Sequence, residues 1–357
     1  MSDANWKTGF EIELLAPRGR TRRDLAQALA DQVGGAVHRA FHPQSEISEV
    51  PGLPVFENLT LAFDAVDRAG QLIARCADDL TIMADLDQAA SSLPGWYRIV
   101  SDDSRFLRLI MQQCDPAWPH QDVLKPIAAL FGTDLQTTDE LVRLDDTMGA
   151  SIAIAATLPN ERERPCEVIT PPLTRDHRAT LARLLDTARD LHFTVPLEAA
   201  VHVHFDATRL RDAKTLSRLI RLLHRDGDRL KELVGTNPNC RRLGSMPDDL
   251  VAAVTASGFT DLDWPAARMQ LSELELSKYT DFNFLNIVYE MPGKPTFEVR
   301  IFPGAMDADQ ILTWTRLFVG ILEWAGHGGD ALPDADRVYR DLSLPDDDRE
   351  KLGLRRD

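Results

Sequence analysis

Three short stretches of the chain alternate polar or ionisable residues with large apolar ones, and each could carry metal or phosphate chemistry. They are residues 9–14, with Glu11 and Glu13; residues 201–205, with His202 and His204; and residues 297–302, with Glu298 and Arg300. A period of two is typical of a half-buried strand, whose polar side chains share one face. Buried carboxylates and imidazoles are costly unless a cation or a ligand compensates them. The three stretches therefore predict one sheet that gathers its polar face around metal.

The residue types indicate which metals and ligands would fit. Mg²⁺ and Mn²⁺ prefer carboxylate oxygen and tolerate an occasional imidazole, so the glutamates and one histidine suit two or more such ions bridging a polyphosphate. Arg300 could offer a planar fork to a phosphate oxygen. The sequence has no G-x-x-x-x-G-K-[ST] loop and no G-x-S-x-G elbow. A phosphate site in this chain would therefore depend on metals and arginines.

The hydrophobic pattern predicts an α+β fold: a curved, mostly antiparallel sheet with helices packed on one face. We expect hairpins at 59–65 with 71–77 and at 283–290 with 296–302, further strands at 96–100, 151–157 and 166–170, and a loop at 38–54. Helices are expected at 123–131, 173–191, 213–234, 248–256, 265–276 and 307–325. Residues 1–335 are predicted to form a single catalytic domain. Residues 336–357 are predicted to form a polar tail, loosely held beyond Leu332.

Composition excludes several function classes. The 357 residues, 44% of them hydrophobic, can bury a large core. The formal charge of −16 argues against a nucleic-acid or acidic-membrane surface. No secretory signal and no apolar run of membrane-spanning length is present. The four cysteines are far apart without C-x-x-C spacing, so we expect reduced thiols in a cytoplasmic protein.

Together and in this order, the motifs resemble the amidoligases, a family of the carboxylate–amine ligase superfamily with the glutamine synthetase catalytic fold. The resemblance spans roughly residues 8–325. It rests on Gly-Phe-Glu-Ile-Glu at 9–13, residues 96–104, Cys-Glu-Val-Ile-Thr-Pro-Pro-Leu at 166–173, His-Val-His at 202–204, Lys278-Tyr279 with Asn283 and Asn286, and Phe-Glu-Val-Arg-Ile-Phe-Pro-Gly at 297–304. The chain departs from the family pattern at Asp102-Asp103-Ser104, where aspartate-glycine-serine is usual.

The resemblance implies a role for each matching residue. Glu13 and Glu167 would hold one divalent ion near the acceptor carboxylate, and Glu11, His202 and Glu298 another against the nucleotide phosphates. His204 would line the substrate or phosphate side of the site, and Arg300 would neutralise the transferring phosphoryl group. Either Arg241 or Arg242 would bind phosphate or carboxylate, and Lys278, Tyr279 and Asn283 would face the ligands, with Lys278 on the nucleotide side.

The implied activity is an ATP-dependent ligation that needs Mg²⁺ or Mn²⁺ and joins a small-molecule or peptide carboxylate to an amine through an acyl phosphate. The identities of the acid and the amine, the residue that deprotonates the amine, and the oligomeric state stay open. A cupin-like metal enzyme would also present H-x-H and a glutamate on strands, but it would not explain Glu11 with Glu13 or Arg300 beside Glu298. A catalytically inactive ligand-binding relative is the other alternative, and the intact set of carboxylates argues against it.

Overall fold

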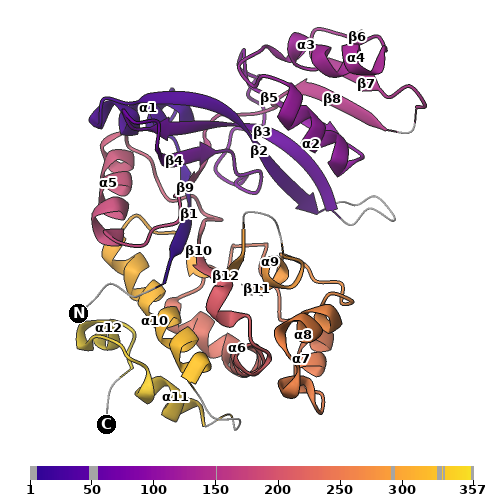
Figure 1. The fold of residues 1–357 in the computed structure, drawn as a ribbon. Coiled ribbons are helices and arrows are strands. Elements are labelled where there is room, and N and C mark those ends of the chain that lie inside the picture. Colours follow the sequence, from indigo (N-terminus) through magenta and orange to yellow (C-terminus); the bar gives the residue numbers. More distant parts are fainter. Residues whose placement is uncertain are drawn as a thin grey trace. The chain divides into compact units, whose positions relative to one another are not determined.

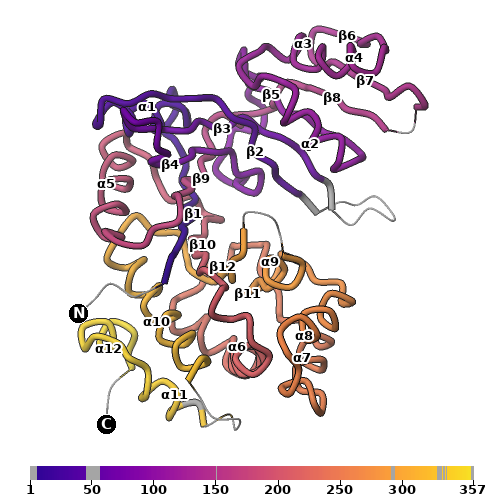
Figure 2. Tube along the Cα trace, in the orientation of Figure 1, coloured from indigo at the N-terminus to yellow at the C-terminus, as the bar shows by residue number. Residues whose placement is uncertain are grey.

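A computed structural model describes residues 6–47, 55–149, 151–290, 294–327, 332 and 334–354. The chain divides into two compact units, which we describe separately (Figures 1 and 2). The first unit comprises Met1–Ile12, Pro172–Asp186 and Glu198–Asp357, and the second comprises Glu13–Pro171 and Thr187–Leu197. Each unit contains antiparallel strands and helices. The predicted α+β class with antiparallel pairing is therefore confirmed.

The strands of the first unit contain two of the polar–apolar stretches whole and the N-terminal one as far as Ile12. Its strands run in the order β11 (Phe282–Asn283), β12 (Thr296–Pro303), β10 (Ala200–Asp206) and β1 (Thr8–Leu15, of which Thr8–Ile12 belong to this unit). All three ladders are antiparallel. The register places Glu11 opposite His202, and His204 opposite Glu298. The prediction that Glu11 and the H-x-H strand share one sheet is confirmed.

A β-bulge interrupts the pairing of β10 with β12. Val201 lies opposite Phe302 and Val203 opposite Val299, so two residues, Arg300 and Ile301, face the single residue between the valines. The extra residue shifts the alternation of β12 by one position. Glu298 and Arg300 therefore share the polar face, while Phe302 turns to the apolar face, which strict alternation would not have predicted.

Helices cover the apolar face of this sheet. Helix α6 (Ala213–Val234) contacts β12, and α10 (Ala308–His327) packs beside α6 (Figure 1). The Phe302 ring stacks on Trp314 of α10 with ring centroids 5.5 Å apart. Helix α5 (His177–Asp190) brings its first residue edge-on to Phe10 of β1. The three long helices predicted at 173–191, 213–234 and 307–325 are thus confirmed, although α5 begins four residues later than expected, after the positive φ of Asp176.

The shorter elements of the first unit correct one prediction. They are η1 (Ala207–Leu210), α7 (Asp248–Thr255), η2 (Phe259–Asp261), α8 (Trp264–Leu271) and α9 (Leu285–Val288). The strand predicted at 283–290 is wrong beyond β11, because the Asn283 side chain accepts a hydrogen bond from the Leu285 amide and starts the helical turn of α9.

The C-terminal segment is more firmly held than the sequence suggested. It forms α11 (Ala335–Asp341) and α12 (Asp346–Lys351). Asp348 of α12 accepts hydrogen bonds from Thr313 and Arg316 of α10, each 2.8 Å in length. Leu342 packs against Gly320, where an added Cβ would meet it at 3.5 Å. The expectation of a loosely held tail is wrong for residues 334–354. The contacts that hold this segment join residues far apart in the sequence, so no local pattern indicates them.

The second unit contains the other antiparallel strands. Its strands follow the order β9 (Pro165–Ile169), β4 (Leu72–Ala77), β3 (Val55–Val66), β5 (Tyr97–Ser101), β8 (Ile152–Thr157), β7 (Leu141–Asp145) and β6 (Gln136–Thr137), and β2 (Ala36–Ile47) also pairs with β3. The loop predicted at 38–54 is wrong where β2 lies, and residues 48–54 lie outside the described residues. Pro43 is compatible with β2 because this strand pairs on one side only.

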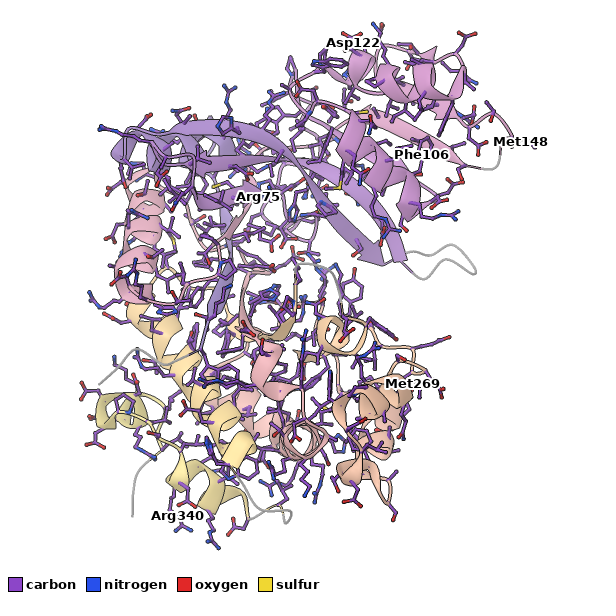
Figure 3. The ribbon with its side chains drawn as sticks, in the orientation of Figure 1. Arg75, Phe106, Asp122, Met148, Met269 and Arg340 are labelled. Carbon is purple, nitrogen blue, oxygen red and sulfur yellow. The ribbon has the colours of Figure 1, made fainter. Side chains whose placement is uncertain are left out.

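Helices α1 (Arg22–Gln32), α2 (Ser104–Gln113), α3 (His120–Val123) and α4 (Lys125–Phe131) complete the second unit. We had not predicted α2. Asp103, in the loop that departs from the family pattern, caps it by accepting a hydrogen bond from the Arg105 amide. Phe106 of α2 is buried in a core shared with β5, β7 and β8 (Figure 3). The departure at this loop therefore serves to begin a helix.

A buried ion-pair network also lies in the second unit. Arg162 Nη2 lies 2.8 Å from Asp78 Oδ1, and Arg22 is fully buried with hydrogen bonds to main-chain carbonyls of Leu61 and Arg162. All four cysteines are free, as predicted. Among the described residues, no helix has the length and apolar character needed to span a membrane.

Candidate functional site

Two histidines and two glutamates from three adjacent strands gather on the polar face of the first unit's sheet. His204 Nε2 lies 3.1 Å from Glu11 Oε1 and 4.0 Å from Glu298 Oε1. His202 Nδ1 lies 3.5 Å from Glu11 Oε2 and 3.7 Å from Glu298 Oε1. These side chains are between 6% and 14% exposed. Cross-strand pairing thus places both imidazoles between the two carboxylates.

Glu298 is fixed from two further sides. Arg300 Nη1 donates a 2.6 Å hydrogen bond to Glu298 Oε1, and Asn283 Nδ2 donates a 2.7 Å bond to Glu298 Oε2. Arg300 and Asn283 are both buried. Each oxygen of this carboxylate therefore has a different neighbour, and the guanidinium is held beside the cluster.

The His204 ring is also held at its other nitrogen, Nδ1. His204 Nδ1 lies 3.2 Å from Thr296 Oγ1, and Thr296 Oγ1 accepts a 3.1 Å hydrogen bond from Asn286. The contact at Nδ1 fixes the ring orientation and directs Nε2 toward Glu11. Lys294 Nζ lies 3.8 Å from Glu11 Oε1. Lys294 and Thr296 escaped the sequence analysis because neither belongs to a motif, although Thr296 begins the E-x-R strand and Lys294 lies just before it.

Burial and the neighbouring charges act oppositely on the ionisation of the cluster. Burial raises the pKa of Glu11, but His204, His202 and Lys294 outweigh it and bring this pKa well below its ordinary value. Burial also raises the pKa of Glu298, but Arg300 and the two histidines outweigh this effect and lower the pKa to about 2. Both carboxylates are therefore ionised at neutral pH.

The two histidines differ in the direction of their pKa shifts. Burial, with Arg300 adding to it, lowers the pKa of His202 and favours the neutral ring. For His204, burial also acts downward, but Glu11 and Glu298 outweigh it and raise the pKa. A positive charge is thus favoured at the His204 position, between the two carboxylates.

The donor atoms fit a divalent cation. Glu11, His204 and Glu298 each offer one ligand atom, and these atoms lie within 4.8 Å of one another. His204 Nε2 is buried and lies 3.1 Å from Glu11 Oε1, so this nitrogen faces the carboxylate ligands. Two ionised carboxylates with imidazole suit Mg²⁺ or Mn²⁺. The first unit alone therefore provides a candidate metal centre.

Arg241, Arg242 and Lys278 were also predicted to line the site. The Arg241 side chain is 85% exposed, with Nε 3.5 Å from Glu198 Oε1. Arg242 is half-buried, and Lys278 Nζ lies 5.3 Å from the centroid of the Tyr279 ring. No contact described for Arg241, Arg242 or Lys278 joins them to the carboxylate–histidine cluster. Their implied roles stay predictions.

Glu13 and Glu167 belong to the second unit. Glu13 is buried, and Glu167 Oε2 lies 3.9 Å from His42 Nε2. The sequence analysis missed His42 because the segment around it had been predicted as a loop. His42 lies on β2, which is held by its pairing with β3, and it reaches Glu167 of β9. No local motif indicates such long-range pairing.

The chain was also compared with known proteins. A family model described as "Putative amidoligase enzyme" matches residues 4–322. Neither the curated proteins nor the solved structures contain a significant match to this chain. The antiparallel α+β architecture fits the glutamine synthetase-like catalytic fold that the resemblance implied, and the name of the family implies a ligase. Because the match includes β1, β10 and β12 with the whole of the cluster, we conclude that the chain belongs to the amidoligase family.

Proposed function

We propose that the protein is an ATP-dependent, divalent-metal-dependent ligase that joins a carboxylate to an amine. The observation that carries this proposal is the cluster of Glu11, His204 and Glu298 with Arg300 beside it. A simple structural ion pair would need only Glu298 and Arg300. The additional buried carboxylate and two imidazoles are better explained by a cation and a phosphorylated ligand.

The chemistry has two steps that need no protein nucleophile. A carboxylate oxygen of the acid attacks the γ-phosphorus of ATP, and ADP leaves, which gives an acyl phosphate. The amine nitrogen then attacks the acyl carbon, inorganic phosphate leaves, and the amine loses a proton to give a neutral amide. Both steps depend mainly on positioning and on charge neutralisation.

The residues of the cluster would divide this work. Glu11, His202, His204 and Glu298 would hold Mg²⁺ or Mn²⁺, which supplies charge neutralisation to the phosphates when bound. The ionised carboxylates and the neutral form of His202 are the protonation states required of ligands. Arg300 would meet the transferring phosphoryl group. Glu13 and Glu167 are proposed for a second ion, and Lys278 with Arg241 or Arg242 for the nucleotide or the acid.

Calorimetry tests this function before any substrate is known. The wild-type protein should bind ATP, or a non-hydrolysable analogue, with Mg²⁺ and much more weakly with EDTA. Glu298→Gln should lose this dependence, whereas Glu140→Gln, at an exposed position, should keep it. Metal-independent binding of ATP, or none, would contradict the proposal. A cupin-like enzyme or an inactive relative predicts no ADP release with any acid and amine, and a panel of both tests this.

A further inference from the structure

Asn283 is held at both ends of its carboxamide. Its Oδ1 accepts a 2.9 Å hydrogen bond from the Leu285 amide, and its Nδ2 donates to Glu298 Oε2 at 2.7 Å. A backbone N–H can only donate, so the oxygen must face Leu285 and the NH₂ group must face Glu298. Asn283 also lies directly opposite Glu298 in the β11–β12 ladder. The family resemblance suggested that Asn283 faces a ligand, but both of its polar ends are used inside the protein.

This contact makes the two oxygens of Glu298 unequal. Oε2 is directed to the carboxamide, while Oε1, which accepts the hydrogen bond from Arg300, lies 3.7 Å from His202 Nδ1 and 4.0 Å from His204 Nε2, on the side of the candidate metal ligands. Glu298 would therefore coordinate an ion through Oε1 alone. Mg²⁺ is small and takes near-octahedral single-oxygen contacts, whereas Ca²⁺ is larger and often takes both oxygens of a carboxylate.

We propose that Asn283 is a positioning residue that sets the metal preference of the site. By holding Oε2 against its carboxamide while Oε1 faces the histidines, it restricts Glu298 to coordination by one oxygen and favours Mg²⁺ or Mn²⁺ over Ca²⁺. The inference rests on the proposed function only in requiring that the cluster binds a divalent ion. A purely structural role, the start of α9, would change stability and leave metal preference unchanged.

The test measures metal binding without substrates. Mn²⁺ binding is followed by the electron paramagnetic resonance signal of the free ion, and Mg²⁺ and Ca²⁺ are each titrated as competitors. In Asn283→Ala the ratio of Ca²⁺ to Mg²⁺ affinity should rise on the order of tenfold, the range expected for loss of one hydrogen bond to a charged group. Asn283→Ser should behave alike, and its hydroxyl preserves an acceptor for the Leu285 amide if the alanine variant folds poorly.

Asn237→Ala is the matched control. Asn237 also uses both ends of its carboxamide, donating to the Ala199 carbonyl and accepting from the Asn239 amide, but no carboxylate is among those partners. In Asn237→Ala the ratio of Ca²⁺ to Mg²⁺ affinity should stay at the wild-type value. A wild-type protein that binds no divalent ion would overturn the metal site itself. A wild-type preference for Ca²⁺, or an unchanged ratio in the folded Asn283 variants, would overturn the role of Asn283 and leave the metal site standing.

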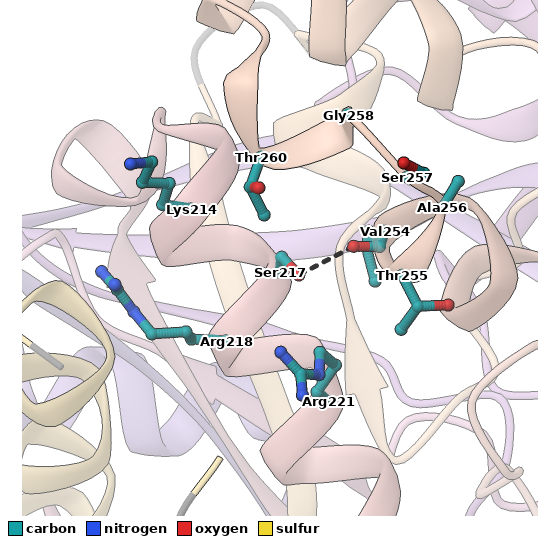
Figure 4. Close-up of a pocket in the computed structure, with 10 residues that line it drawn as sticks. All are labelled: Lys214, Ser217, Arg218, Arg221, Val254, Thr255, Ala256, Ser257, Gly258 and Thr260. Carbon is teal, nitrogen blue, oxygen red and sulfur yellow. Dashed lines mark hydrogen bonds between the residues drawn. The ribbon is translucent and has the colours of Figure 1, made fainter. Parts of the chain in front are cut away.

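A second inference concerns a cavity of about 360 Å³ in the first unit, between α6 and the segment after α7 (Figure 4). Lys214, Arg218 and Arg221 follow one another at helical spacing on α6, and four hydroxyl residues complete the polar lining: Ser217, Thr255, Ser257 and Thr260. None of the described residues that line the cavity is acidic, although the chain as a whole carries a net charge of −16. The cavity shares no residue with the carboxylate–histidine cluster.

The C-terminal carbonyls of α7 are not vacant partners for these cations. The Val254 carbonyl accepts a 2.7 Å hydrogen bond from Ser217, and the Ala252 and Ala253 carbonyls accept from the Thr255 hydroxyl and the Ala256 amide. Arg218 Nε donates to the Ala325 carbonyl of α10, which fixes that side chain. Three cationic side chains beside four hydroxyl residues form a lining that is suited to an oxyanion.

We infer that this cavity binds a small phosphate-bearing anion. The apolar lining is limited to Val254 and Ala256, which favours a phosphate or diphosphate group over a flat aromatic ligand. Pyrophosphate is therefore the probe, titrated calorimetrically in EDTA so that the metal cluster contributes nothing. The Lys214→Ala, Arg221→Ala double variant should lose at least tenfold in affinity. Arg340→Ala removes an exposed cation on α11 (Figure 3) and should bind as wild type does. Equal affinity in the double variant, or no binding by wild type, would overturn this site.

Discussion

Replacing Arg300 by lysine distinguishes a phosphoryl-binding arginine from a structural one. Arg300 Nη1 lies 2.6 Å from Glu298 Oε1, and both side chains are 6% exposed. Lysine keeps the positive charge beside the carboxylate but cannot present two donors in one plane. If the guanidinium contacts the transferring phosphoryl group, turnover should fall on the order of ten- to a thousandfold.

The effect on stability can be estimated from the same pair. The pKa of Glu298 lies at about 2, against an ordinary 4.5. One pKa unit corresponds to about 1.4 kcal/mol, so the surroundings favour the ionised carboxylate by about 3 kcal/mol, shared among Arg300 and the two histidines. Arg300→Lys retains the charge and should cost about 1 kcal/mol or less. Arg300→Met leaves a buried carboxylate without its guanidinium and should cost about 3 kcal/mol.

The assay pairs ADP release, with an acid and an amine that support turnover, with urea unfolding of each variant. The loss of stability in Arg300→Met should become smaller when Mg²⁺ is added, because a bound cation replaces part of the missing positive charge. Unchanged turnover in Arg300→Lys would assign Arg300 to structure and would weaken the ligase proposal. Equal stability of Arg300→Met and wild type would refute the electrostatic reasoning.

Three further predictions concern stability. Although burial opposes it, the hydrogen bonds from Arg316 and Thr313 lower the pKa of Asp348. The ionised Asp348 therefore stabilises the fold fully above its ordinary pKa of 3.8, and this stabilisation is lost as pH falls through the lowered pKa. The loss of unfolding free energy in Asp348→Asn, measured by urea unfolding, should be largest near pH 7 and should shrink below about pH 4. Asp78→Ala should cost about 3–5 kcal/mol, because it leaves buried arginines unpaired, whereas Asp64→Ala removes a more exposed pair with Arg75 and should cost about 1 kcal/mol or less. Mg²⁺ should raise the melting temperature of wild type but not that of Glu11→Gln, and EDTA should reverse the rise.

Local alternation was sufficient to predict the strands of the cluster. Residues 9–13 and 201–205 place a charged or imidazole side chain at every second position between apolar ones, and that pattern survives in β1 and β10. Helix α6 was predicted with its observed bounds because its leucine stripe ends at Gly235, which has the positive φ of a helix C-cap.

Features that depend on distant partners could not be predicted in this way. The polar C-terminal segment becomes helical because Asp348 meets α10, and β2 forms because β3 pairs along its whole length despite Pro43. Asn283 appeared to be a ligand-facing residue until its two hydrogen bonds were known. The single catalytic domain over 1–335 and the roles of Arg241, Arg242 and Lys278 stay predictions.

The bulge in β12 gives the strand one residue more than its pairing with β10 needs. Glu298 and Arg300 lie on the polar face before the bulge, and Phe302 lies on the apolar face after it, packed on Trp314. Deletion of Ile301 would make Phe302 follow Arg300 directly, so regular alternation would keep Phe302 on the apolar face against α10. Insertion of a second residue beside Ile301 would have no such compensation. The strand should therefore tolerate the loss of one residue at the bulge better than the gain of one.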